Sequence, residues 1–372
     1  HSPSNQPLAH VRILFIKLEH IGDALLMTPT LASVRERYPD AEIWVVVRRG
    51  CEGVLAGCPA IDRLLTAPAP ERGKRARGDL SKSFNLVWEI RRKRFDHVFE
   101  LSDGERGRWI SAFTRTRHRC TNGGVLPLSR FWRLFFDQIA SSNWLGLHTV
   151  EKDYRTVAEF LSLPREIPRM TFDPGGKEPW EPAAASDDFA FLHPATRWQR
   201  KRWPEGKWIE LGKALLDRLP RLIVSCGPDA EEIESTRLLC ERLGERVLFT
   251  GGNLSWGQVA WLLDRARLFV GVDTAAMHLA AACQCPTAAI FGPSVPWCWR
   301  PWRVPSRILA PEAHEVYSCR QDEFAEVAAL KTADVTVEQV IAACDGLLST
   351  GRGGQAESVE VPRETKGAAN GL

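Results

Sequence analysis

Short apolar runs of strand length recur along this chain of 372 residues, and each is followed by a segment long enough for a helix. In the first half the runs cover residues 11–17, 43–47, 61–65 and 96–101. In the second half they cover residues 189–193, 221–226, 246–250, 268–272 and 287–291. Continuous apolar strands that alternate with helices are typical of a parallel sheet covered on both faces. The sequence therefore predicts an α/β fold.

The alternation is interrupted once, between residues 164 and 188, where Pro, Gly and small residues predominate. We therefore predict two Rossmann-like domains, 8–165 and 189–348, joined by a linker at 166–188. The polar, Gly-rich residues 349–372 are expected to form a disordered tail. Helical patterns are expected after the first strand up to Arg37 and near residues 128–142, 149–163, 205–219, 229–243, 255–266, 274–284 and 336–348.

Composition indicates a cytoplasmic globular protein. Hydrophobic residues make up 44% and charged residues 26%, and no apolar stretch approaches the roughly 18 residues of a membrane span. The first residues lack the basic and apolar regions of a secretion signal. The ten cysteines include no Cys-x-x-Cys pair, and Cys283 and Cys285 have no companions at zinc spacing, so we expect reduced thiols and no structural zinc.

Positive charge is concentrated in the first half. Residues 1–170 carry 27 Lys and Arg against 19 Asp and Glu, a net +8, whereas residues 171–372 net −5. One basic cluster lies in a loop bounded by Pro and Gly and consists of Arg72, Lys74, Arg75 and Arg77. Such a cluster either binds an anionic partner or keeps a solvated loop soluble, and the sequence favours neither.

Three strand-to-helix turns carry residues suited to chemistry, and ligands of open α/β sheets bind beyond the carboxyl ends of strands. In the first turn Gly22 permits a tight turn and Asp23 starts a helix, where a carboxylate is also a common helix cap. The turn contains neither G-x-G-x-x-G nor G-x-x-x-x-G-K-[ST], which weakens a dinucleotide or P-loop interpretation.

The second turn, residues 193–204, places four cations within six residues after a strand: Arg197, Arg200, Lys201 and Arg202. With Thr196 and backbone N–H groups, this loop suits a phosphate. The alternative is an exposed basic loop.

In the third turn Asp273 ends a buried strand, and a helix of small residues follows. Its first N–H groups, at Thr274, Ala275 and Ala276, favour a diphosphate, and His278 comes one turn later. The alternatives are a capping carboxylate and a core histidine.

Together the three turns resemble the signatures of the ADP-heptose lipopolysaccharide heptosyltransferases, glycosyltransferase family nine, and most closely the heptosyltransferase III type. The motifs are Ile16-Lys17-Leu18-x-His20-x-Gly22-Asp23-Ala24-Leu25-Leu26-x-Thr28-Pro29, His193-Pro194-x-x-Arg197-Trp198-x-x-Lys201-x-Trp203, and Phe269-x-Gly271-x-Asp273-Thr274-x-x-Met277-His278, continuing to Phe291-Gly292-Pro293-Ser294. Ala275 departs from the Gly that many members carry.

This resemblance implies a GT-B fold, in which two Rossmann-like domains face a central cleft, and an inverting transfer of heptose from ADP-heptose to an acceptor hydroxyl of the lipopolysaccharide inner core. It implies Asp23 as the general base and Lys201 as the group that neutralises the departing diphosphate. The remaining donor contacts would come from Gly22, Thr196, Arg197, Glu231, Glu232, Asp273, Thr274, Ala275, Ala276 and His278, with Glu231 and Glu232 on the ribose unless they are ordinary helix-start carboxylates.

The same resemblance implies an N-terminal acceptor domain and a C-terminal nucleotide-sugar domain. If the acceptor is an anionic glycolipid, the basic N-terminal half would meet its charge, and the best candidate residues are Arg72, Lys74, Arg75 and Arg77. We expect no cofactor, no metal and no nucleic-acid partner, and a monomer at the cytoplasmic face of the inner membrane. Two alternatives stay open: a GT-B transferase with another nucleotide sugar or a protein or small-molecule acceptor, and a non-catalytic nucleotide-sugar-binding protein. Asp23 together with Lys201 argues against the second.

Overall fold

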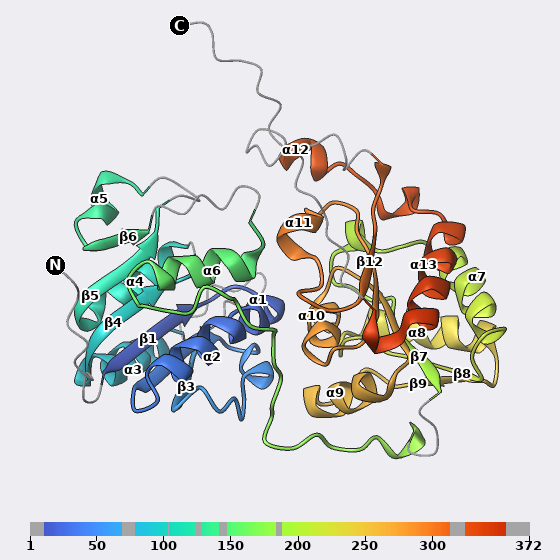
Figure 1. The fold of residues 1–372 in the computed structure, drawn as a ribbon, viewed down its shortest axis with the longest axis horizontal. Coiled ribbons are helices and arrows are strands. Elements are labelled where there is room, and N and C mark those ends of the chain that lie inside the picture. The colour runs from blue at the N-terminus through green and yellow to red at the C-terminus, as the bar shows by residue number, and fades with distance from the viewer. Residues whose placement is uncertain are drawn as a thin grey trace, which may run out of the picture. The chain divides into compact units, whose positions relative to one another are not determined.

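The computed structural model describes residues 11–68, 79–102, 104–123, 128–140, 147–183, 188–312 and 324–354. The chain divides into two compact units. The N-terminal unit comprises the chain up to Trp144 together with Thr149–Gly176, and the C-terminal unit comprises Leu145–His148 and everything from Lys177 onward. Each unit contains one six-stranded, entirely parallel sheet with helices on both faces (Figure 1). The predicted α/β fold with two Rossmann-like halves is therefore confirmed.

In the N-terminal unit the strand order is β3-β2-β1-β4-β5-β6. The strands are β1 (Arg12–Lys17), β2 (Glu42–Arg48), β3 (Arg63–Ala67), β4 (Arg94–Glu100), β5 (Arg115–Asn122) and β6 (Gln138–Ala140). Residues 13–17 of β1 are buried without interruption, as expected for a central parallel strand.

Helices cover both faces of this sheet. On one face lie α1 (Ile21–Leu26), α2 (Thr28–Arg37) and α6 (Thr149–Ala158); the other is covered by α3 (Asp79–Arg92) and α4 (Glu105–Phe113), with the short α5 (Arg130–Arg133) beside α4 (Figure 1). Leu86 and Ile90 of α3 and Ile110 of α4 pack on Leu14 and Ile16 of β1 in one buried cluster. A short 3-10 turn, η1 (Glu52–Val54), follows β2.

One predicted helix of this unit is wrong, and strands β5 and β6 were not predicted. The helix predicted near 128–142 is only the four residues of α5, and the chain then extends into β6, where Ile139 pairs with Thr121. Strand β5 was not predicted, because its sequence Arg-Thr-Arg-His-Arg-Cys-Thr-Asn is polar along most of its length and only its last three residues are buried. In both segments pairing with a neighbouring strand determines the secondary structure, and the local sequence pattern does not.

The C-terminal unit has the strand order β12-β11-β10-β7-β8-β9. Its strands are β7 (Phe189–His193), β8 (Arg221–Val224), β9 (Val247–Phe249), β10 (Leu268–Val272), β11 (Thr287–Ile290) and β12 (Ser306–Leu309). The helices are α7 (Glu205–Leu216), α8 (Ala230–Leu243), α9 (Trp256–Arg265), α10 (Ala275–Ala282), α11 (Pro296–Trp299), α12 (Phe324–Val327) and α13 (Val337–Thr350), with short 3-10 turns η2 (Glu181–Ala183), η3 (Gln199–Lys201), η6 (Thr332–Asp334) and η7 (Gly351–Gly353). Apolar side chains of α7, α8 and α13 form one core with the sheet.

Helix ends in this unit follow the sequence signals. The Asp229 carboxylate accepts hydrogen bonds from the backbone N–H groups of Glu231 and Glu232 and so caps α8. Gly244, with φ of 91°, ends the same helix. Thr336 caps α13 in a capping box with Gln339, as predicted from the polar start of that segment, but the helix continues to Thr350, two residues past the predicted boundary at 348.

Candidate active site

Both sheets reverse their strand order beside their first strand. In the N-terminal unit the reversal lies between β1 and β4, and in the C-terminal unit it lies between β7 and β10. Such a topological switch point, at the carboxyl ends of the strands, is where open α/β sheets bind ligands. The three turns singled out from the sequence follow β1, β7 and β10. The fold therefore brings the second and third turns to one switch point, and the first turn lies at the other.

Asp23 is buried within α1, next to the buried Gly22. Its Oδ2 accepts a hydrogen bond of 2.9 Å from the His20 backbone N–H, and the His20 Nδ1 lies 3.5 Å away. Its Oδ1 is buried and has no hydrogen-bond partner among the described residues. Burial acts to raise the pKa of Asp23, but the hydrogen bonds from His20 and the charge of Lys17 outweigh it and lower the pKa below its usual value. One oxygen of an ionised carboxylate is thus left to accept a proton.

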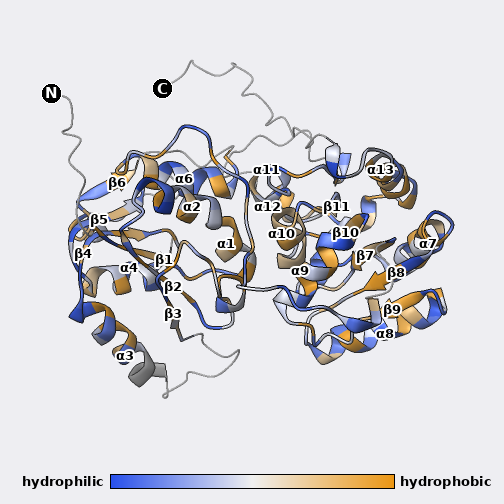
Figure 2. Cartoon of the chain, turned by 60° about the horizontal axis from the view of Figure 1, so that its bottom comes forward, coloured by the Kyte–Doolittle hydropathy of each residue, from blue (hydrophilic) through white to orange (hydrophobic). Residues whose placement is uncertain are grey.

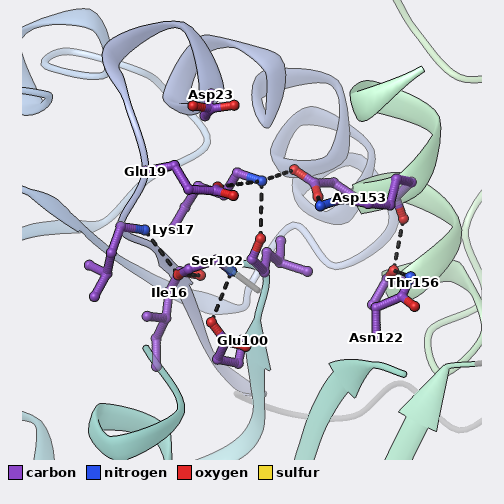
Figure 3. A network of polar contacts seen from close by, with 12 residues as sticks. Ile16, Lys17, Glu19, Asp23, Glu100, Ser102, Asn122, Asp153 and Thr156 are labelled. Carbon is purple, nitrogen blue, oxygen red and sulfur yellow. Dashed lines mark hydrogen bonds and ion pairs between the residues drawn. The ribbon is translucent and has the colours of Figure 1, made fainter. Parts of the chain in front are cut away.

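Beneath this turn lies a buried ionic network (Figure 3). The Lys17 Nζ, at the end of β1, lies 2.9 Å from Asp153 Oδ2 of α6 and 3.0 Å from Glu19 Oε2, and it donates to the Leu101 carbonyl at 3.1 Å. The side chains of Lys17 and Asp153 are fully enclosed. The adjacent Leu18 N–H donates to Ser102 Oγ at 3.0 Å. The ends of β1 and β4 and helix α6 are therefore tied together at the switch point.

In the C-terminal unit the second and third turns meet through an ion pair. The Lys201 Nζ, in η3, lies 2.5 Å from Asp273 Oδ2, just after β10. The His278 Nε2, one turn along α10, lies 3.9 Å from the other oxygen, Asp273 Oδ1. Strands β7 and β10 pair in register at His193 and Gly271, which brings the two loops to the same edge. The structure therefore gathers Lys201, Asp273 and His278 into one cluster.

The start of α10 borders this cluster. Thr274 is its N-cap residue, and the Thr274 Oγ1 is buried without a hydrogen-bond partner among the described residues. Ala275 and Ala276 open the helix, so the N–H groups of this first turn have no partner within the helix. Thr196, in the loop after β7, is buried, and its Oγ1 accepts a hydrogen bond from the Trp198 N–H. These donors and the dipole of α10 favour an anion.

The remaining predicted donor residues differ in burial and in whether their polar atoms already have partners within the protein. Glu231 is exposed and pairs with Arg202 at 2.6 Å. Glu232 is buried; its Oε2 accepts from the Gly227 N–H at 3.0 Å, and its Oε1 has no partner among the described residues. Burial raises the pKa of Glu232 against the Gly227 hydrogen bond. Arg197 is exposed. Of the two carboxylates, Glu232 is therefore the buried one with an unpartnered oxygen among the described residues, whereas Glu231 is exposed and held through Oε1 by Arg202.

Two residues of the site were given no role from the sequence, although Ser294 ends the third motif quoted above. Asp153 was missed, because α6 carries both Glu151 and Asp153 and no local pattern tells which of the two carboxylates is buried against Lys17. Ser294, after β11, places a buried Oγ without a described partner at the edge of the same sheet as the Lys201 cluster. The predicted acceptor residues Arg72, Lys74, Arg75 and Arg77 lie outside the described residues.

The residues that the structure describes hold neither a cluster of metal ligands nor a helix suited to crossing a membrane. Among them no three His, Cys, Asp or Glu side chains gather closely enough to hold a metal ion. Within the same ranges no helix has the length and apolar character to cross a membrane. The nine cysteines recorded in this part of the chain are all free thiols.

The sequence profile of glycosyltransferase family 9 (heptosyltransferase) matches residues 84–327, more than half of the chain. The chain belongs to this family. Lipopolysaccharide heptosyltransferase 3 of Escherichia coli is 25% identical over 294 residues, which cover 76% of the chain and 83% of that relative. Lipopolysaccharide heptosyltransferase 1 of Pseudomonas aeruginosa is 29% identical over 300 residues, covering 77% and 80%.

Solved structures agree with the family in fold. The E. coli heptosyltransferase WaaC with ADP superposes with a TM-score of 0.72 at 19% identity, covering 91% of the chain and all of that structure. The expected GT-B fold and the expected glycosyltransferase class are thus confirmed for this family 9 member. The roles of individual residues remain predictions.

Proposed function

We propose that the protein transfers heptose from ADP-heptose to a hydroxyl group of the lipopolysaccharide inner core. Membership of family 9 and likeness to two lipopolysaccharide heptosyltransferases support this proposal. The observation that carries it is the ion pair between Lys201 and Asp273 beside the start of α10, at the switch point of the C-terminal sheet. That arrangement suits a sugar attached to a diphosphate, since it offers a cation and N–H donors to the phosphates and a carboxylate to sugar hydroxyls.

In this proposal the C-terminal unit binds the donor. Lys201 exchanges part of its contact with Asp273 for the diphosphate and stabilises the charge that develops on departing ADP. The N–H groups at Thr274, Ala275 and Ala276, with the Thr196 hydroxyl, donate to phosphate oxygens. Asp273 and His278 contact the sugar or its phosphate, and Glu232 accepts hydrogen bonds from the ribose hydroxyls.

Asp23 is the proposed general base. Its lowered pKa keeps the carboxylate ionised at neutral pH, and its Oδ1 has no described partner, so it can take the proton of the acceptor hydroxyl as the C–O bond to the anomeric carbon forms and the bond to ADP breaks. The Lys17 network holds the turn that carries this carboxylate. A base positioned against the face opposite the leaving group gives inversion at the anomeric carbon.

We also propose that the reaction needs no metal, because Lys201 and the α10 dipole supply the positive charge that the diphosphate requires. The N-terminal unit would bind the acceptor, and the enzyme would act as a monomer at the cytoplasmic face of the inner membrane. Full activity in the presence of a metal chelator is the expected result for this part of the proposal.

The deciding experiment combines purified protein, ADP-heptose and truncated lipopolysaccharide cores, with ADP release as the readout. The Asp23→Asn variant should lose about 10²–10⁴-fold in turnover while it binds ADP normally, because its amide oxygen still accepts the His20 N–H. Asp62→Asn, which changes a carboxylate on the surface of the same unit, is the matched control and should be as active as wild type. Asp23→Asn turnover within a few-fold of wild type would make Asp23 a structural residue.

Two other outcomes discriminate the alternatives. Release of a different nucleoside diphosphate in a panel of nucleotide sugars would favour another donor. Tight binding of ADP-heptose without turnover on any acceptor would favour a non-catalytic binding protein.

A further inference from the structure

Exposed large apolar side chains gather on one side of the N-terminal unit. Eight such side chains occur among the described residues; five of them lie on α3, α4 and α5, and a sixth, Leu134, directly follows α5 as its C-cap. We call these six the aromatic face; they are between 42% and 83% exposed and comprise Phe84, Trp88, Trp109, Phe113, Phe131 and Leu134. Single exposed apolar residues are ordinary, but a cluster of this kind marks a binding surface.

The aromatic face is organised rather than scattered. Phe84 and Trp88 stack one helical turn apart on α3, with ring centroids 6.2 Å apart, and Trp109 and Phe113 stack in the same way on α4 at 5.9 Å. Phe131 of α5 lies 5.9 Å from Trp109. The opposite sides of α3 and α4 bury Leu86, Ile90 and Ile110 against the sheet. The exposed rings are therefore not needed to fill the core of this unit.

An apolar cavity of about 420 Å³ lies between α3 and α4. Trp109 and Phe113 line it from α4, and Ser83 and Val87, next in sequence to Phe84 and Trp88, line it from α3. Of the two stacked pairs, Trp109 and Phe113 line this recess, and Glu105 and Arg106 line it as well. Phe84 and Trp88 lie on the exposed side of α3 next to it. Figure 2 shows hydrophobic and hydrophilic residues side by side along the described part of α3, as expected for a helix at the boundary between core and surroundings.

Positive charge surrounds the aromatic face. Residues 79–140 carry 12 Lys and Arg against 7 Asp and Glu, a net +5, whereas the whole chain nets +3. Exposed Arg91 donates to the Phe113 carbonyl at 3.1 Å, and exposed Arg130 and Arg133 flank Phe131 on α5. The carboxylate of Glu89 on α3 is paired with Arg63. Exposed aromatic rings bordered by arginines are the combination that enters the headgroup region of a bilayer.

We infer that the aromatic face docks the N-terminal unit on the surface of an anionic phospholipid bilayer. Charge decides between a bilayer and a second copy of the chain, because two copies would bring like charges together, whereas acidic headgroups complement the arginines. The rings then supply apolar contact at headgroup depth, and the recess between α3 and α4 can admit part of an acyl chain. This inference rests on the proposed location at the cytoplasmic face of the inner membrane and names the surface that would make the contact, whereas it does not depend on which sugar the enzyme transfers.

The test is flotation of the purified protein with vesicles, in the absence of ADP-heptose and acceptor. Wild type should float with vesicles of phosphatidylethanolamine and phosphatidylglycerol and much less with phosphatidylcholine alone, and high salt should weaken binding. Phe84→Ser/Trp88→Ser should lower the partition coefficient about tenfold or more, because two largely exposed rings are lost. The separate variant Arg130→Ser/Arg133→Ser should lower the partition coefficient for anionic vesicles by about fivefold per charge removed.

Leu238→Ser is the matched control, because Leu238 is 41% exposed but lies on α8 of the C-terminal unit. It should float like wild type. Unchanged flotation of Phe84→Ser/Trp88→Ser, or failure of wild type to float with anionic vesicles, would overturn the inference. If wild type instead sediments as a dimer and this double variant as a monomer, the aromatic face is an interface between copies. ADP release with a soluble acceptor should stay normal in every variant, which separates this test from that of the proposed function.

Discussion

Replacing Lys17 by Met removes a buried ammonium group that joins three parts of the N-terminal unit. Its Nζ contacts Asp153 on α6, Glu19 in the turn after β1, and the Leu101 carbonyl at the end of β4. Met retains most of the apolar stem, so the packing volume changes little. The substitution therefore tests the charge rather than the space it occupies.

The size of the effect follows from what is left behind. The Asp153 side chain is fully enclosed, and after the substitution its nearest recorded cation is Lys152, 3.7 Å from Oδ1. Breaking one partner of a buried pair costs about 3–5 kcal/mol. Because Lys152 compensates part of that charge, we expect a loss of about 3 kcal/mol for the N-terminal unit. An exposed pair such as Lys177 with Asp264 is worth about 1 kcal/mol at most.

Urea unfolding of wild type, Lys17→Met and the control Lys177→Met, followed by circular dichroism, measures both losses. Lys17→Met/Asp153→Asn should be more stable than Lys17→Met alone, because the second substitution removes the uncompensated carboxylate. A loss below about 1 kcal/mol in Lys17→Met would refute the argument that the network holds this turn. If the stability loss of the double variant equals the sum of the losses of Lys17→Met and Asp153→Asn, the cost lies in packing rather than in charge.

Three further outcomes are expected. Lys201→Ala should weaken ADP binding about 10–100-fold and slow transfer, since a charged hydrogen bond is lost and Asp273 then repels the diphosphate; calorimetry should show little change for Arg200→Ala, an exposed cation of the same loop. Burial lowers the pKa of His193 from 6.5 to about 4, so the unfolded chain binds a proton below pH 6.5 that the folded protein does not. The free energy of unfolding of wild type should therefore fall by about 3 kcal/mol more than that of His193→Gln between pH 6.5 and pH 4, with no such difference above pH 6.5. Equal pH dependence of the two unfolding free energies, measured with urea, would contradict this. Replacing the loop cations Arg72, Lys74, Arg75 and Arg77 by Ser should raise the acceptor KM, most at low ionic strength, with the ADP-heptose KM unchanged; an unaltered acceptor KM at low salt would leave the loop a solubility role.

The central strands could be predicted because burial on both faces leaves a continuous apolar signal. Residues 11–17 and 189–193 were identified within one residue of β1 and β7. Strand β5 escaped because its arginines alternate along a partly exposed strand, and the Arg119 guanidinium is used to bind the carbonyls of Ser111, Thr114 and Phe135. These hydrogen bonds of Arg119 require the end of α4 to lie beside β5, and no local sequence pattern predicts that position.

The candidate site divides in the same way. The resemblance to the family had placed Lys201 and Asp273 in one donor site, and the strand order seen in the structure gives the reason, because both turns follow strands that flank a switch point. The pairing of Lys17 with Asp153 did not, because α6 is separated from β1 by more than 130 residues and returns to it through tertiary packing. The structure distinguishes Glu231, which is exposed and paired with Arg202, from Glu232, which is buried with an Oε1 that has no partner among the described residues, and the sequence does not fix either side-chain direction.

The boundary between the two units has a consequence for dissecting the chain. His148 belongs to the C-terminal unit although 28 residues of the N-terminal unit, Thr149–Gly176, follow it. It is fully buried there, its Nε2 lies 2.8 Å from the Arg300 carbonyl, and its ring lies 4.7 Å from that of Trp302. A fragment that begins at Lys177 would lack this imidazole and leave a hole beside the Trp302 indole. Neither half of this enzyme is therefore a contiguous piece of sequence, and a single cut cannot separate them without removing an internal part of one.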